Sequence, residues 1–188
     1  LNEEGPSSIF SFPRGTKAGT FLHDIFEHLD FAEKDTSLMK KLVANKLKEY
    51  GFELTWQEAL WHTIQKVLSV PLEPERSDFT LSRIQNKDRL NELEFYFPLK
   101  SISPKKLDSI FAKYAGSEPF ATFPERTERL DFAPVRGFMK GFMDMVFHFQ
   151  NRFYLVDWKS NFLGSSVEHY DQEALAAAMK DEFYIIQY

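Results

Sequence analysis

The segment from Gly137 to Ser160 constrains the fold more than any other part of the chain. It holds two apolar, β-prone stretches that are interrupted only at Gln150-Asn151-Arg152. Such a short polar break between two strand patterns predicts a tight turn, and therefore a β-hairpin over residues 137–158. If the turn is centred on Gln150 and Asn151, residues whose numbers add up to 301 face each other across the hairpin.

Two aspartates meet in this register. Asp144 and Asp157 share one face, with Cβ atoms about 4.5–5.5 Å apart, and Lys159 points to the same face. Opposed carboxylates repel each other, and a divalent cation between them removes that cost. Such a hard oxygen site suits Mg²⁺, and a neighbouring lysine can orient or deprotonate a water or stabilise charge on a phosphate. The pattern predicts a metal-dependent phosphodiesterase.

A solvated Asp–Lys pair at a sheet edge is the simpler alternative, because the tripeptide D-x-K is common on protein surfaces. The register is itself an inference from the turn. A slip of one residue would place Asp144 on the opposite face of the hairpin. The hairpin alone therefore leaves both interpretations open.

Helical and strand patterns surround the hairpin. Apolar spacing predicts five helices, over 18–30, 37–50, 55–70, 104–115 and 170–188. Thr55 and Glu58 are expected to form a capping box, and Ser103 to cap the fourth helix. Alternation predicts a strand over 92–98, and 116–134 is expected to be a long loop. These elements predict an α/β (α+β) protein with a mixed, mainly antiparallel central sheet flanked by helices.

The first sixteen residues are rich in Pro, Gly and Ser, which predicts a linker or arm over 1–16 and one domain over 17–188. The chain begins at Leu1 rather than Met and ends at Tyr188 inside a predicted helix. We therefore expect it to be a C-terminally truncated fragment of a larger polypeptide.

Composition excludes several classes of function. The absence of cysteine excludes disulfides and Cys-ligated zinc or iron–sulfur sites. The sequence has no apolar run of membrane-spanning length and no signal peptide, so we expect a cytoplasmic protein without membrane contact. A phosphate-binding G-x-x-x-x-G-K-[ST] motif is also absent, which argues against ATP hydrolysis. The net charge of −5 argues mildly against a broad electrostatic grip on nucleic acid, but metal-binding carboxylates are themselves acidic.

Other residues are candidates with simpler alternatives. His23, on the first predicted helix, is either a histidine at the edge of the core or a ligand to the same metal. Glu94 belongs either to a solvated strand face or to the metal site as an outer carboxylate. Tyr184, Gln187 and Tyr188 share one face of the last predicted helix, either as a buried stripe or as a lining for nucleic acid.

The stretches FPRGTKAGTFLHDIFEHLDF, NELEFYFPL, GFMKGFMDMVFHFQNRFYLVDWKSNFLG and YIIQY occur in this order. Together they resemble the nuclease domain of RecB, the large subunit of the bacterial RecBCD helicase–nuclease (exodeoxyribonuclease V). The resemblance covers nearly the whole chain. It implies the restriction-endonuclease-like core of the PD-(D/E)xK superfamily, and a DNA exonuclease or endonuclease of recombination and repair that uses one or two Mg²⁺ ions.

The resemblance also implies roles for single residues. His23, Asp144 and Asp157 resemble the metal ligands, with the backbone carbonyl of Trp158 as a further ligand, and Lys159 resembles the catalytic lysine. Glu94 resembles an auxiliary glutamate, and Tyr184 and Gln187 match a motif expected to contact DNA. Trp158 stands where the family usually has Tyr, a conservative departure. The family's last helix carries a further tyrosine, one turn beyond the point where this chain ends.

The resemblance implies DNA, preferentially single-stranded, as substrate. RecC- and RecD-like subunits are the implied partners, with RecA as a further candidate. Two rivals remain: a non-catalytic docking module that keeps a nuclease-like fold, and a stand-alone nuclease that acts on RNA or branched DNA. The complete set of His23, Asp144, Asp157 and Lys159 argues against the first rival, and the linker-like start argues against the second.

Overall fold

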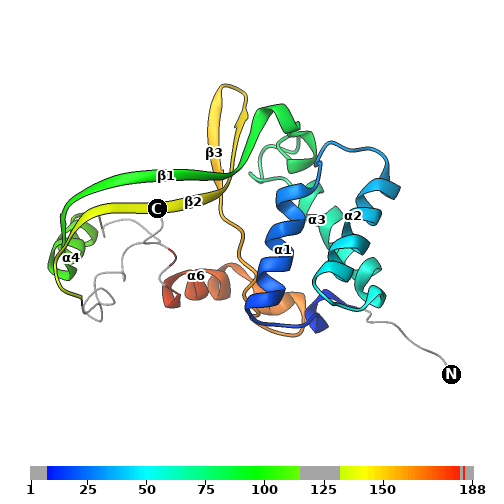
Figure 1. The fold of residues 1–188 in the computed structure, drawn as a ribbon, viewed down its shortest axis with the longest axis horizontal. Helices are drawn as coiled ribbons and strands as arrows, with labels where there is room; N and C mark the ends of the chain where they lie inside the picture. The colour runs from blue at the N-terminus through cyan, green and yellow to red at the C-terminus, as the bar shows by residue number, and fades with distance from the viewer. Residues whose placement is uncertain (1–7, 115–131, 183, 185–188) are drawn as a thin grey trace. The chain divides into compact units, whose positions relative to one another are not determined.

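A computed structural model describes residues 8–114, 132–182 and 184 (Figure 1). The chain divides into two compact units. Unit 1 comprises residues 1–93 and 142–166, and unit 2 comprises 94–141 and 167–188. Three strands form one sheet of order β1-β2-β3, namely Arg89–Ile102 (β1), Val135–Phe149 (β2) and Arg152–Val156 (β3). This combination of helices with a small antiparallel sheet confirms the α/β (α+β) class, and it is compatible with a restriction-endonuclease-like core.

Unit 1 contains three helices at the predicted places: Thr16–His28 (α1), Thr36–Glu49 (α2) and Gln57–Ser69 (α3). Each buries an apolar stripe at helical spacing, such as Phe21 and Ile25 on α1. The side chain of Asp35 caps α2 by accepting a hydrogen bond from the Ser37 amide. The predicted capping box of α3 is wrong, because Thr55 instead donates to Glu53, and Glu58 is paired with Lys40.

Aromatic side chains fill the core of unit 1. Phe21 is fully buried, with its ring centroid 5.4 Å from that of Phe12, 5.5 Å from Tyr50 and 5.1 Å from Phe52. Phe12 lies within the segment predicted to be a linker, yet it is buried in this cluster. The described part of that segment therefore packs on the helices, while the domain boundary at residue 17 stays a prediction.

The predicted hairpin and its register are confirmed. Gln150 and Asn151 form the turn with φ values of 45° and 64°, both in the left-handed region that favours tight hairpin turns. β2 and β3 are antiparallel, with pairs running from Phe149↔Arg152 to Met145↔Val156. Every pair keeps the predicted sum, so Asp144 and Asp157 lie one step beyond the last pair.

Unit 2 contains residues 94–102 of β1 and 135–141 of β2, together with the helices Pro104–Tyr114 (α4) and Gln172–Asp181 (α6). The bounds of β1 and α6 differ from those predicted. β1 is much longer than the predicted strand over 92–98. The last helix, predicted over 170–188, ends at Asp181, with Glu182 at its C-cap. The predicted cap of α4 is confirmed, since the Ser103 hydroxyl accepts a hydrogen bond from the Lys106 amide.

Short 3-10 turns complete the described elements, at Ile9–Ser11 (η1), Leu54–Trp56 (η2), Leu81–Arg83 (η3), Asn86–Asp88 (η4) and Val167–Tyr170 (η5). None of the helices in the described part of the chain combines the length and the apolarity that a bilayer crossing requires.

Candidate metal centre

The predicted metal ligands and the predicted catalytic lysine all belong to unit 1. His23 lies in the middle of α1, Asp144 lies on β2, and Asp157, Trp158 and Lys159 follow the end of β3. The confirmed register places the two aspartates at the same end of the strand pair, one residue beyond the last pair, Met145↔Val156. What the sequence did not reveal is how α1 is held beside them.

One face of α1 packs along the segment after β3. A Cβ on Gly19 would lie 3.1 Å from the Ser160 hydroxyl oxygen, so the missing side chain allows a close approach. Two turns further on, the Phe26 ring stacks on the Trp158 ring at a centroid distance of 4.4 Å. His23 lies between Gly19 and Phe26 on this face. These contacts place its imidazole at the hairpin end.

The C-terminal end of α1 is attached to the start of β1. The buried Arg89 donates from its guanidinium to the Leu29 carbonyl, and the Asn91 amide donates to the Glu27 carbonyl. Carbonyls at a helix end lack intrahelical partners, so donors from a neighbouring strand satisfy them. β1 thus fixes the helix that carries His23.

Asp144 connects the helix to the hairpin. Its Oδ2 lies 3.5 Å from Nδ1 of His23 and accepts a hydrogen bond of 2.6 Å from the backbone amide of Trp158. The Trp158 backbone therefore meets the site through its N–H group in this structure. The predicted role of its carbonyl as a ligand stays a prediction. Asp144 keeps a further oxygen, Oδ1, that can serve a cation.

Asp157 and Lys159, which follow β3, form an ion pair, and each side chain is one quarter exposed. The Asp157 Oδ2 atom is buried, and it accepts no hydrogen bond from the described residues although Lys159 contacts it. The Lys159 ammonium is therefore the partner of this buried oxygen, and a cation is the kind of group that stabilises a buried carboxylate. Carboxylates and an imidazole are suitable ligands for Mg²⁺ or Mn²⁺.

Glu92 was not singled out from the sequence, yet it belongs to the electrostatics of this site. Partial burial raises its pKa, the charges of Asp144 and Glu27 raise it further, and His23 acts in the opposite direction. Its φ of 49° interrupts the regular alternation of β1, which the sequence pattern could not show. Glu94, the predicted auxiliary residue, lies in unit 2, where Lys140 and the Tyr96 hydroxyl contact its carboxylate.

The predicted DNA-contacting residues have a different outcome. Tyr184 lies beyond the end of α6 at Asp181. Gln187 and Tyr188 lie outside the described residues. Their role in DNA binding stays a prediction.

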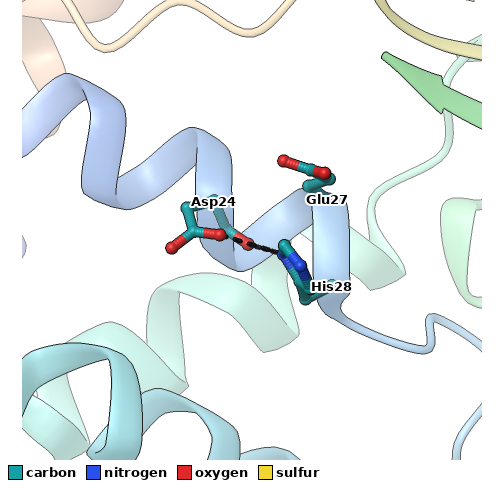
Figure 2. A group of neighbouring side chains, drawn as sticks. All are labelled: Asp24, Glu27 and His28. Carbon is teal, nitrogen blue, oxygen red and sulfur yellow. Dashed lines mark hydrogen bonds and ion pairs between the residues drawn. The ribbon is translucent and has the colours of Figure 1, made fainter. Parts of the chain in front are cut away.

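A second group of possible ligands lies on α1 itself. Asp24, Glu27 and His28 are the one group of three among the described residues whose ligand atoms all lie within 4.8 Å of one another (Figure 2). However, Asp24 Oδ1 is 2.9 Å from His28 Nδ1, and Oδ2 is 2.8 Å from Nζ of Lys46 on α2. Since Lys46 already neutralises Asp24, this cluster serves to tie α1 to α2.

This tie predicts a pH-dependent stability. Burial alone would raise the pKa of Asp24, but hydrogen bonds from Lys46 and Tyr50 outweigh it and hold that pKa below 3.8. A depressed carboxyl pKa stabilises the fold above the unfolded-state value, and the contribution is lost as pH falls through the folded-state value. Asp24→Asn should therefore cost about 1–2 kcal/mol of unfolding free energy at pH 7, and this cost should shrink as the pH falls below the ordinary carboxyl pKa.

Urea unfolding of the wild type and of Asp24→Asn at several pH values measures this difference. The exposed Glu75→Gln is the matched control, and its unfolding free energy should follow the wild type at every pH. A deficit of Asp24→Asn that persists undiminished in acid would contradict the ion-pair explanation.

Comparison with known proteins finds RecB subunits of several bacteria. The chain is 37% identical over 191 residues to the RecBCD enzyme subunit RecB of Escherichia coli, covering 99% of this chain and 15% of that subunit. It is 32% identical to the RecB subunit of Haemophilus influenzae over 100% of this chain, and 30% identical to that of Buchnera aphidicola from Acyrthosiphon pisum over 96%. No family model matches. The chain spans about 15% of the length of these curated relatives. The chain is therefore a homologue of RecB subunits, and it corresponds to one segment of those much longer proteins.

Proposed function

We propose that this chain is the nuclease domain of a RecB-type subunit, and that it hydrolyses phosphodiester bonds of DNA with Mg²⁺, preferring single strands. The observation that carries the proposal is that the His23–Asp144 contact and the Asp157–Lys159 ion pair lie at the same end of the hairpin in unit 1. Kinship with RecB subunits supports it, since those proteins are named as parts of the RecBCD enzyme. On the same basis we propose cytoplasmic assembly with RecC- and RecD-like subunits.

In this proposal Asp144, Asp157 and His23 hold the metal ion. Bound there, Mg²⁺ supplies Lewis-acid stabilisation of phosphate charge and lowers the pKa of a coordinated water. Asp144 is oriented by the Trp158 amide and by His23, so its carboxylate is preorganised. The Lys159 ammonium contacts Asp157 and can steady the negative charge that develops on the phosphate, or position the attacking water.

Substitutions of the two histidines of α1 distinguish this metal centre from a metal site at the cluster of Asp24, Glu27 and His28. If the centre lies at the hairpin, His23→Ala should weaken Mn²⁺ binding at least about tenfold and slow cleavage, because a ligand is lost. His28→Ala, five residues further along the same helix, should leave both properties near the wild-type level. Isothermal titration with Mn²⁺ and cleavage of labelled single-stranded DNA measure the two effects.

The opposite pattern, with His28→Ala as the damaging change, would move the metal to α1 and refute the proposed ligand set. A folded wild-type chain that neither binds Mn²⁺ nor cleaves DNA would favour the alternative of a non-catalytic docking module.

A further inference from the structure

The β1–β2 ribbon is drawn in Figure 1, and its residues 94–102 and 135–141 belong to unit 2. Several aromatic side chains of this part are exposed to solvent. Phe138 on β2 is 77% exposed, and Tyr96 on β1 is 63% exposed. Large apolar surfaces are usually covered in soluble proteins, so exposed aromatics that are close together and next to charges suggest a binding surface. The question is which ligand the neighbouring side chains favour.

The contacts place both aromatics on one face of the ribbon. Lys140 forms an ion pair with Glu94, and its Nζ lies 5.3 Å from the centroid of the Tyr96 ring. Glu94, Tyr96 and Lys140 thus lie on the same side, and alternation adds Lys100, Arg136 and Phe138 to it. The Phe95 ring lies over Gly141 on the opposite side, which agrees with this assignment. We call this surface the ribbon face: Glu94, Tyr96, Lys100, Arg136, Phe138 and Lys140.

The ribbon face is basic although the chain as a whole is acidic. Over 94–102 and 135–141 the two strands hold three basic residues, Lys100, Arg136 and Lys140, and one acidic residue, Glu94. All four lie on the ribbon face, which gives it a net charge of +2 within a chain of net charge −5. Hydrogen bonds to Glu94 and Tyr96 raise the pKa of Lys140, so its ammonium stays charged at neutral pH.

Aromatic rings interleaved with cations match single-stranded nucleic acid in particular. Unpaired bases stack on aromatic rings irrespective of their sequence, while lysine and arginine contact the phosphates between them. Duplex DNA offers the phosphates but hides the faces of its bases inside the stack. A protein partner would not require the alternation of cation and ring on β2, where Arg136, Phe138 and Lys140 follow one another on the same face.

We propose that the ribbon face is a binding surface for single-stranded nucleic acid, on which Phe138 and Tyr96 stack bases and Arg136, Lys100 and Lys140 contact phosphates. The choice of ligand rests on the proposed nuclease function. The surface itself uses none of the residues assigned to the metal centre.

Fluorescence anisotropy tests the surface with the 188-residue chain and a labelled oligo-dT of about 15 nucleotides in EDTA, where no cleavage occurs. Phe138→Ala should weaken binding about tenfold, and Tyr96→Ala should weaken it severalfold. Phe153→Ala is the matched control: this β3 residue is 76% exposed but lies in unit 1, so binding should stay within about twofold of the wild type.

Salt dependence tests the cations separately. Arg136→Ala should reduce the slope of log affinity against log salt concentration by about 0.7, the value of one contact with a single-strand phosphate. Unlabelled duplex of the same length should compete much less well than unlabelled single strand. Normal affinity in both Phe138→Ala and Tyr96→Ala, equal competition by duplex, or no binding of oligo-dT by the wild type would each overturn the proposal.

Failure of this surface and failure of the nuclease function are distinguishable. Binding that depends on Phe138 in a chain that never cleaves would leave the ribbon face standing and refute only catalysis. If the wild type cleaves DNA while Phe138→Ala and Tyr96→Ala bind oligo-dT normally, catalysis would stand and only the ribbon face would be refuted.

Discussion

Asp157→Asn is expected to reduce Mg²⁺-dependent cleavage of single-stranded DNA at least about 100-fold, because it removes the negative charge of a proposed metal ligand. The substitution keeps the shape of the side chain, so it tests charge rather than packing. Its Oδ2 position is buried, and Lys159 is the cation that contacts it. Initial rates over a range of Mg²⁺ concentrations measure the loss, and they show whether added metal restores any activity.

Glu75→Gln is the matched control, because it removes one carboxylate charge at an exposed position in unit 1. It should cleave at the wild-type rate. Circular dichroism and a thermal melt establish that Asp157→Asn is folded. Wild-type activity of a folded Asp157→Asn protein would mean that the hairpin does not hold the catalytic metal.

The hairpin is the element that the sequence predicted in most detail. Its turn needed only a short polar break between two β-prone stretches, and alternation then determined every pair down to Met145↔Val156. Local rules were sufficient because the partners are close in the chain. The same applies to α1 and α2, whose apolar stripes give the correct elements within one or two residues.

The features that failed depend on distant contacts or on the ends of elements. Thr55 was expected to cap α3, but Glu58 is held by Lys40 of α2, eighteen residues away in sequence. Phe12 was placed in a linker, and only the cluster around Phe21 explains its burial. The left-handed φ of Glu92 is likewise invisible to an alternating pattern.

The predicted site likewise combines a part that follows from local sequence with a part that depends on distant contacts. The spacing of Asp144, Asp157 and Lys159 follows from the hairpin alone, whereas the proximity of His23 depends on how α1 packs. That packing involves the close approach of the Ser160 hydroxyl to Gly19 and the stacking of Phe26 on Trp158. No periodicity encodes either contact. The resemblance to a family therefore favoured His23 as a ligand, and the structure shows which contacts bring it close to the hairpin.

Phe21→Ala should lower the free energy of unfolding by about 3–5 kcal/mol, the usual cost of removing a large aromatic ring from a core. Phe21 has no exposed surface, and its ring packs against Phe12, Tyr50 and Phe52. These neighbours come from two separate segments, one at Phe12 and one at the end of α2, so they cannot all move inwards to fill the cavity. Urea denaturation followed by fluorescence measures the change.

The position of Phe21 links this stability to the site, because it lies two residues before His23 on α1 and anchors the helix from the opposite side. Cleavage by Phe21→Ala should therefore fall at temperatures where the wild type is fully active, and recover on cooling. Phe153→Ala, an equal truncation at a position 76% exposed, should cost less than about 1 kcal/mol. If both truncations destabilised the protein equally, the aromatic cluster around Phe21 would not be the centre of the fold.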